Sequence, residues 1–165
     1  MSCIDRNTFN LNLTEISQIA EKLNDNWKLI KTTNNNSSIL YLEKQEQVIN
    51  KDDNMLLTFI YHIVYSESFQ VPVFYLNAYK SNGSPLSYPD IYKHFKLDAS
   101  NSLMVLSQQE HPLLFKPFYF LHPCKTAEWM STTNSTSNIN NYTLRWLSFV
   151  SFTLNISFDY LKYIQ

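Results

Sequence analysis

The reactive side chains of this sequence concentrate in a segment near residue 120. His122, Cys124 and Lys125 follow an aromatic run, and a proline stands directly before the cysteine. The chain must turn there, so we expect an exposed thiol at a strand end, which becomes nucleophilic once deprotonated. His122 and Lys125 are close enough in sequence to favour the thiolate or to orient a carbonyl group. The alternative interpretation is that Cys124 is a small apolar residue of the core, the commonest fate of a free cysteine.

Other reactive constellations fit the sequence less well. A cysteine hydrolase needs a histidine that reaches the thiol, and the four histidines all precede Cys124 with no protease signature around them. A metal site made of His111, His122 and Cys124 lacks both helical and Cys-x-x-Cys spacing. His62 alternates with apolar residues, so we expect it to be a hydrogen-bonded histidine of a sheet.

Low counts of glycine and cysteine exclude several classes of binding site. The 165 residues include one glycine and two cysteines, Cys3 and Cys124. One glycine excludes the P-loop and the dinucleotide fingerprint, which need several at fixed spacing. Two cysteines are too few for a disulfide framework or a thiolate zinc site. Thirteen basic residues against fourteen acidic ones leave no excess positive charge for nucleic acid.

The sequence also carries a prediction of cellular location. Its first residues have no apolar stretch of the kind that directs secretion, and the longest mostly apolar run, 55–65, is interrupted by Thr58 and His62. We therefore expect a cytoplasmic protein with free thiols and without stable membrane insertion.

These residues must be positioned by the folded chain, and the hydrophobic pattern predicts one α+β domain over residues 1–165 with a largely antiparallel sheet. An N-terminal helix is predicted by an apolar stripe, with Asn10 or Asn12 as its cap. The stripe consists of Phe9, Leu13, Ile16, Ala20, Leu23 and Trp27. Strands are predicted at 27–31, 39–42, 55–66, 71–80 and 116–121.

Three further features complete the predicted layout. The run 55–66 is apolar on both faces, which is typical of a central strand covered on both sides. Asn82-Gly83 predicts a tight turn, and 88–95 a short helix with proline in its first turn. A polar loop at 131–141 then precedes a buried, terminal helix around 144–150.

Seven segments share their order and spacing with a known family. They are Tyr61-His62-Ile63-Val64-Tyr65-Ser66, Gln70-Val71-Pro72-Val73, Asn82-Gly83-x-Pro85-Leu86, Asp90-Ile91, Gln108-Gln109-Glu110-His111-Pro112, Pro117-Phe118 and Leu121-His122-Pro123-Cys124-Lys125-Thr126. Over residues 57–131 the chain closely resembles the autophagy-related protein ten family of E2-like conjugating enzymes. The resemblance implies an E2-like core whose sheet is flanked by an N-terminal and a C-terminal helix.

The resemblance also implies a reaction for Cys124. In the family, the cysteine of His-Pro-Cys forms a thioester with the C-terminal glycine of a ubiquitin-like modifier, protein twelve of the pathway. The modifier arrives from an E1-like activating enzyme, protein seven, and leaves to a lysine of the acceptor, protein five. Neither step needs a bound cofactor or metal. We expect a monomer because the chain is small.

The group that stabilises the oxyanion and supports the attacking lysine is left open. Ordinary ubiquitin-conjugating enzymes carry His-Pro-Asn before the cysteine, whereas Cys124 itself occupies the third motif position here. The candidates are His122, a nearby backbone N–H and the phenol of Tyr65. A tyrosine is frequent in the family where this chain has Phe69.

Two alternative functions remain. The lipid-conjugating relative, autophagy-related protein three, also carries His-Pro-Cys, but its membrane-sensing N-terminal helix and large acidic insertion are not visible in this sequence. The other alternative is a non-catalytic module that uses an aromatic sheet to hold partners. The intact Cys124 argues against that module, and a thiol-sensitive adduct at Cys124 would distinguish an enzyme from it.

Overall fold

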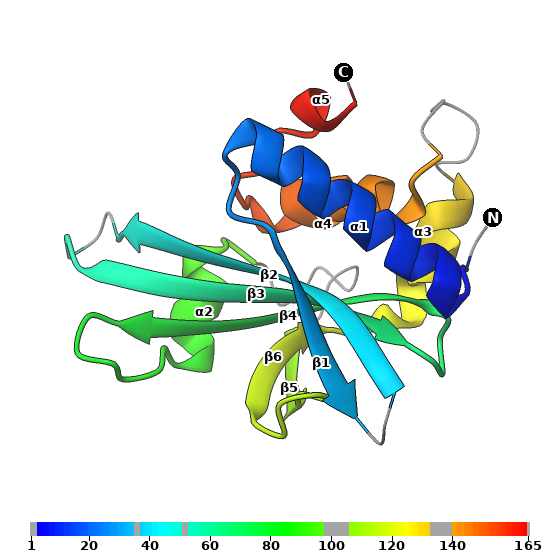
Figure 1. The fold of residues 1–165 in the computed structure, drawn as a ribbon. Helices are drawn as coiled ribbons and strands as arrows, with labels where there is room; N and C mark the ends of the chain where they lie inside the picture. The colour runs from blue at the N-terminus through cyan, green and yellow to red at the C-terminus, as the bar shows by residue number, and fades with distance from the viewer. Residues whose placement is uncertain (1–2, 35–36, 51–52, 98–105, 133–139, 165) are drawn as a thin grey trace.

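A curved antiparallel sheet with helices packed on one face forms the computed structural model (Figure 1), which describes residues 3–34, 37–50, 53–97, 106–132 and 140–164. Within these ranges the strand order is β1-β2-β3-β4-β6-β5. The strands are β1 (Lys28–Asn34), β2 (Ser37–Ile49), β3 (Leu56–Ser66), β4 (Val71–Lys80), β5 (Leu106–Glu110) and β6 (Pro117–Leu121). Each neighbouring pair runs antiparallel, so the predicted α+β class is confirmed.

The helices lie before, between and after these strands. They are α1 (Arg6–Leu23), α2 (Tyr88–His94), the 3-10 turn η1 (Pro123–Lys125), α3 (Thr126–Thr132), α4 (Tyr142–Leu154) and α5 (Tyr160–Tyr163). In Figure 1, α1 crosses in front of α4 on the same side of the sheet. Among the described helices, none is both long enough and apolar enough to cross a membrane.

The N-terminal helix is confirmed, but two of its predicted details are wrong. Its buried face follows the predicted stripe until Leu23, which is its last residue and is partly exposed, while Trp27 is buried beyond the helix end. The N-cap is Asp5, whose Oδ1 accepts the Thr8 N–H at 2.7 Å, rather than Asn10 or Asn12. An aspartate just before the first turn satisfies an otherwise unpaired N–H, so the helix begins earlier than the apolar pattern suggests.

Asn12 lies within α1, in the contact between the two long helices, instead of at a helix cap. Its Oδ1 accepts the Thr143 N–H at 3.1 Å, and its carbonyl accepts the Asn141 amide at 3.1 Å. All three residues are buried. A buried amide with satisfied partners costs little, so α1 and α4 meet through polar groups inside an otherwise apolar contact.

The central strands agree with prediction, while the edge elements were partly missed. β3 and β4 match their predicted ranges within one residue at each end. β2 runs far beyond the predicted 39–42, because pairing with β3 up to Ile49–Leu56 holds a polar stretch in the sheet. β5 has one buried side chain, that of Leu106, so its sequence carries little apolar signal.

The predicted polar loop at 131–141 is wrong at both ends. Ser131 and Thr132 belong to α3, and Asn141 is the buried N-cap of α4; residues 133–139 lie outside the described ranges. The helix predicted around 144–150 spans Tyr142–Leu154, and α5 follows it, so it is not terminal. Asn141 Oδ1 accepts the Leu144 N–H at 2.8 Å, which explains the earlier helix start.

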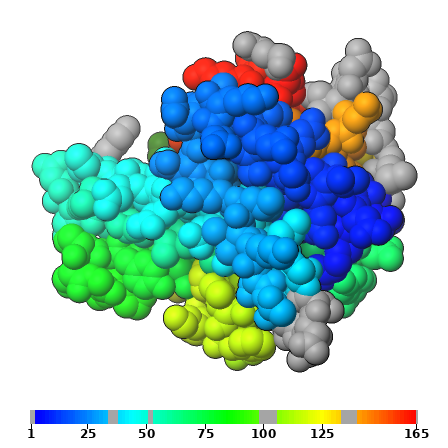
Figure 2. Space-filling view, viewed as in Figure 1, coloured from blue at the N-terminus to red at the C-terminus, as the bar shows by residue number. Residues whose placement is uncertain are grey.

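Two apolar clusters cover the two faces of β3, as its pattern predicted. The larger cluster lies between the sheet and the helices. The smaller cluster, on the opposite face, contains Tyr41, Val64, Val73, Tyr75, Phe118 and Phe120, with Ile30 and Leu113 packed against it. Its residues come from β1 and β2 on one side, from β3 and β4 in the middle, and from the β5–β6 hairpin on the other side. Figure 2 shows the yellow-green hairpin lying against the light-blue end of β1.

Gly83 and Phe115 are two of the seven described residues in the left-handed region of the backbone. Gly83 has φ +81°, in agreement with the predicted turn at Asn82-Gly83. Phe115, between β5 and β6, has φ +53° although it is not a glycine, and its side chain is 65% exposed. This conformation costs a bulky side chain on the order of 1–2 kcal/mol.

We predict that Phe115→Gly raises the free energy of unfolding by about 0.5–1 kcal/mol. The substitution removes the left-handed strain, and the greater flexibility of glycine in the unfolded chain cancels part of the gain. Urea denaturation measures the change. Asn24→Gly is the matched control, because Asn24 has φ +53° but asparagine tolerates this region. A loss of stability in Phe115→Gly would contradict the prediction.

Candidate active site

Cys124 lies where β6 gives way to a short helical segment. Pro123 begins η1 and is buried, while Cys124 beside it is exposed. Thr126 and Met130 of the following α3 are buried and fix this segment to the core. The structure therefore places the thiol at an exposed strand end, where the sequence predicted it, on backbone that is anchored from both sides.

His122 is oriented by the backbone of Cys124. Its Nδ1 accepts the Cys124 N–H at 3.2 Å, and its ring contacts those of Phe69 and Phe120 at centroid distances of 5.7 and 5.9 Å. A nitrogen that accepts carries no proton, so Nε2 carries the N–H of the neutral ring. Of the candidate oxyanion donors, the Cys124 N–H is thus engaged by His122, whereas His122 Nε2–H has no hydrogen-bond partner among the described residues.

The turn between β3 and β4 forms a wall beside His122. Phe69, which contacts the His122 ring, is 44% exposed in this turn. The turn is attached to the start of the chain, because the Ile4 N–H donates to the Gln70 carbonyl at 2.9 Å and Arg6 pairs with Glu67. The N-terminal segment thereby holds the aromatic wall in place.

Tyr65, the other predicted supporting residue, contacts the N-terminal segment that is hydrogen-bonded to the same turn. Its hydroxyl donates to the Ile4 carbonyl at 2.8 Å, and the Arg6 guanidinium lies 5.0 Å from its ring centroid. Burial raises the pKa of the Tyr65 phenol, so the hydroxyl keeps the proton that it donates. Among the described contacts, none joins Tyr65 to Cys124 or His122.

Lys125 points its ammonium at a neighbouring carboxylate. Its Nζ lies 3.2 Å from Glu128 Oε2, and both side chains are more than half exposed. An exposed pair of this kind contributes little stability, and its partners exchange readily with water. The lysine beside the thiol is therefore a solvated cation that remains available to an approaching partner.

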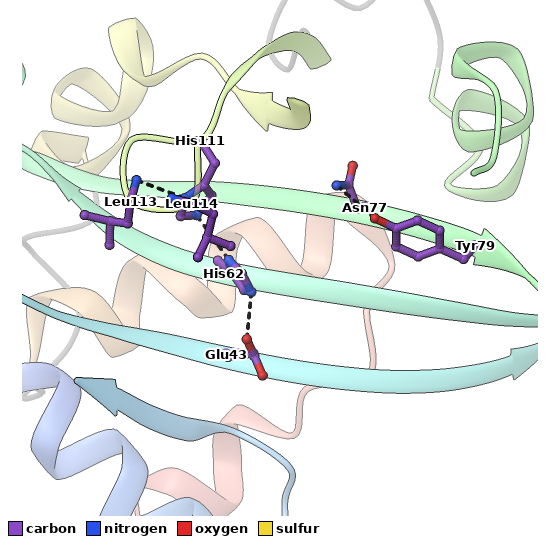
Figure 3. A network of polar contacts seen from close by, with 7 residues as sticks. All are labelled: Glu43, His62, Asn77, Tyr79, His111, Leu113 and Leu114. Carbon is purple, nitrogen blue, oxygen red and sulfur yellow. Dashed lines mark hydrogen bonds and ion pairs between the residues drawn. The ribbon is translucent and has the colours of Figure 1, made fainter. Parts of the chain in front are cut away.

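A second polar constellation lies on the face of the sheet away from the helices (Figure 3). His62 on β3 places Nδ1 3.1 Å from His111 Nε2 and Nε2 3.0 Å from Glu43 Oε2 on β2. His111 Nδ1 accepts the N–H groups of Leu113 and Leu114, each at 3.2 Å. The prediction that His62 is a hydrogen-bonded sheet histidine is confirmed. Its partnership with His111 was missed, because 49 residues separate the two rings in the sequence.

The hydrogen-bond directions define the protonation of this pair. His111 Nδ1 accepts, so His111 Nε2 carries a proton and donates it to His62 Nδ1. His62 Nε2–H in turn donates to the Glu43 carboxylate. Burial lowers the pKa of His62 to about 4, and burial together with the nearby His62 lowers the pKa of His111 to about 4. Both rings are therefore neutral near pH 7.

The structure separates the residues of the hypothetical metal site. His111 precedes β6 and Cys124 follows it, so the two lie at opposite ends of a five-residue strand. In the described part of the chain, no three His, Cys, Asp or Glu side chains are grouped so that they could hold a metal ion.

We predict that stability falls as the pH is lowered from about 6.5 to about 4. The unfolded chain protonates His62 and His111 near pH 6.5, whereas the folded chain does so near pH 4, so the unfolded state binds more protons between these values. Each histidine contributes a slope of up to about 1.4 kcal/mol per pH unit. Urea denaturation at several pH values measures this slope.

His62→Gln removes one titrating group and should reduce the pH dependence of unfolding. His94, whose pKa burial also lowers, retains its contribution in this variant. The hydroxyls of Tyr41 and Tyr75, whose rings lie against the pair, have raised pKa values and do not titrate in this range. A slope unchanged by His62→Gln would contradict the assignment of a buried neutral pair.

Comparison with known proteins matches one family model and several curated relatives. The family model described as "Autophagocytosis associated protein, active-site domain" matches residues 3–160. The human "Ubiquitin-like-conjugating enzyme ATG10" is 38% identical over 118 residues, which cover 65% of this chain and 54% of that protein. The protein of the same name from Dictyostelium discoideum is 36% identical over 127 residues, with 65% and 55% covered.

A solved structure supports the fold. The "Crystal structure of Autophagic E2, Atg10" superposes with a TM-score of 0.59 at 17% identity and covers 94% of this chain and 99% of that one. This likeness confirms the E2-like arrangement of a sheet flanked by N-terminal and C-terminal helices. The chain spans about half the length of the curated relatives it matches.

Proposed function

This chain belongs to the family of autophagocytosis-associated active-site domains, and from that membership we propose that it is an E2-like conjugating enzyme of autophagy. It accepts a ubiquitin-like modifier as a thioester on Cys124 and transfers the modifier to a lysine. The observation that carries the proposal is the exposed thiol of the His-Pro-Cys segment, held between β6 and α3. The relatives named as ubiquitin-like-conjugating enzymes support it.

Two acyl transfers make up the reaction. In the first, the Cys124 thiolate attacks the carbonyl of the modifier's C-terminal glycine; the new C–S bond replaces the one to the activating enzyme's cysteine, which leaves as a thiolate. In the second, a neutral lysine amine attacks the same carbonyl, an amide forms, and the Cys124 thiolate leaves. The amine's proton passes to a base or to water. A thioester suits both steps because thiolate is a good nucleophile and a good leaving group.

The proposed partners follow the family. Protein seven, the E1-like activating enzyme, delivers the modifier, protein twelve, and protein five supplies the acceptor lysine. We place the reaction in the cytoplasm and assign it to residues 1–165 as one monomeric domain. Neither step requires a bound cofactor or metal, and no nucleic acid takes part.

His122 and Tyr65 have separate supporting roles in this proposal. His122 Nε2–H is the donor to the thioester oxyanion, while Nδ1 holds the ring on the Cys124 backbone. The ring contact with Phe69 keeps Nε2 from rotating away. Tyr65 positions the Phe69 turn through Ile4, without contacting the reacting atoms.

We predict that the purified protein, given activating enzyme, ATP and modifier, forms an adduct at Cys124 that thiol reagents cleave. Cys124→Ser should trap an oxyester that resists those reagents, because an alkoxide is a poorer leaving group than a thiolate. Cys124→Ala should form no adduct, and Cys3→Ala is the matched control that should charge like wild type. Electrophoresis with and without reducing agent measures each product.

The same assay distinguishes the competing functions. A reducible adduct on Cys124→Ala, or none on wild type, would overturn the catalytic assignment and favour a binding module. Transfer from charged enzyme to a lysine of protein five supports the proposal. Transfer to phosphatidylethanolamine vesicles, with protein five left unmodified, would instead place the chain in the lipid-conjugating branch.

A second prediction concerns His122. His122→Ala should lower the rate of discharge to lysine by about tenfold or more, because it removes one oxyanion donor. His122→Asn should keep part of the rate, since its side-chain oxygen can accept the Cys124 N–H and its amide still donates. Single-turnover discharge of preformed thioester measures both. Equal rates in wild type and His122→Ala would contradict the role of His122.

A further inference from the structure

The strand that carries Cys124 has a short attachment to the central sheet. β3 and β4 pair continuously from Leu57–Lys80 to Ser66–Val71. By contrast, among the described residues β4 pairs with β6 only through Tyr75–Phe120 and Leu76–Tyr119. On its other side β6 pairs with β5, the last strand in the described sheet. The β5–β6 hairpin therefore needs contacts besides ladder hydrogen bonds to hold a defined orientation.

His111 organises the turn of this hairpin. Its N–H donates to the Lys116 carbonyl at 2.8 Å, and its own carbonyl accepts the Phe115 N–H at 3.0 Å. Its Nδ1 accepts the two N–H groups of Leu113 and Leu114. His111 thus satisfies the N–H groups of Leu113, Leu114 and the strained Phe115 in this turn.

The other nitrogen of His111 reaches past β4 to the centre of the sheet. Nε2–H donates to His62 Nδ1 on β3, and His62 Nε2–H donates to Glu43 on β2. His111 is 0% and His62 1% exposed, and the rings of Tyr41, Tyr75 and Phe118 lie around them. A buried hydrogen bond without access to water is costly to leave unmade, so the link is a stiff one.

Two other polar contacts join the hairpin to β4. The Asn77 amide donates to the Pro117 carbonyl at 3.0 Å, and the Gln109 amide donates to the Tyr75 hydroxyl at 2.7 Å. Both end on the adjacent strand. The histidine link differs because it connects the turn with β3 and β2, and so restrains the angle of the hairpin to the whole sheet.

From this geometry we propose that the His62–His111 pair is a positioning device for the thioester site: it sets the orientation of β6 and thereby of His122 and Cys124 at the far end of that strand. The proposal rests on the proposed function of Cys124. A change in the angle of β6 displaces the thiol relative to its acyl donor. Displacements of about 1 Å in an active site can cost on the order of a hundredfold in rate.

The test compares variants that break the link with one that keeps it. His111→Asn retains an oxygen that can accept the Leu113 and Leu114 N–H groups, but its shorter side chain cannot reach His62. His62→Leu removes the acceptor toward His111 and the donor toward Glu43, whereas His62→Gln retains an acceptor and a donor. Asn12→Ala, in the α1–α4 contact, is a control that lowers stability without touching the hairpin.

Two measurements are made on each variant. The first is Cys124 charging by activating enzyme and modifier over a range of activating-enzyme concentrations, which separates kcat from KM. The second is hydrogen exchange of the amides of residues 118–122 and of Cys124, which needs no partner. We expect about a tenfold loss of kcat with little change in KM, and faster exchange, in His111→Asn and His62→Leu. His62→Gln and Asn12→Ala should stay within about twofold of wild type.

Failure of the inference and failure of the proposed function give different results. Wild-type kcat and exchange in His111→Asn and His62→Leu would overturn the positioning role, as would an equal loss in Asn12→Ala of matched stability. Absence of charging in wild type overturns the proposed function instead, and the exchange data then still decide whether the pair orients β6. If His111→Asn does not fold, His62→Leu and His62→Gln still provide the comparison between a broken and a retained histidine link.

Discussion

The structure depends on one requirement at the end of β6: the Cys124 thiol must be exposed while the backbone that carries it stays ordered. A thiol that exchanges acyl groups with two large partners must be open to solvent, and Cys124 is exposed. Exposed chain ends and turns are ordinarily the least ordered parts of a domain. Here Pro123 before Cys124 and Thr126 after it are buried and attach this segment to the core, while His122 and Lys125 are exposed like Cys124 itself. The thiol is therefore accessible on a segment that the core holds in place.

Two apolar clusters keep the segment around the exposed thiol ordered, each in a different way. The larger cluster, between sheet and helices, supplies most of the buried surface and anchors α3 through Met130. The smaller one, beneath the β5–β6 hairpin, is mainly aromatic, and the neutral pair His62–His111 packs against its rings. Aromatic side chains alone would bury area without selecting one orientation. Buried hydrogen bonds with fixed directions add that selection.

The sequence predicted helices and strands well where buried residues recur at a regular spacing. It predicted them poorly where an element is formed by pairing or by polar contacts with distant residues. β3 was predicted from apolar residues on both faces, and α1 from its stripe, because each pattern reflects the face that packs. β5 was missed because its side chains after Leu106 are polar and its strand form comes from pairing with β6. Asn12 was predicted only as a possible cap of α1, because periodicity cannot show that its amide will meet Thr143 across the core.

By itself the sequence determined the class of fold, the exclusion of glycine-built phosphate sites and the identity of Cys124 as the candidate nucleophile. These follow from composition, local pattern and a contiguous motif. Only the tertiary structure decided three hydrogen bonds. His122 Nδ1 accepts from the Cys124 backbone, Tyr65 donates to the Ile4 carbonyl of the N-terminal segment, and His111 donates to His62. The physical reason is that a hydrogen bond between distant residues depends on strand order and register, and the side chains of the two partners carry no local sign of each other.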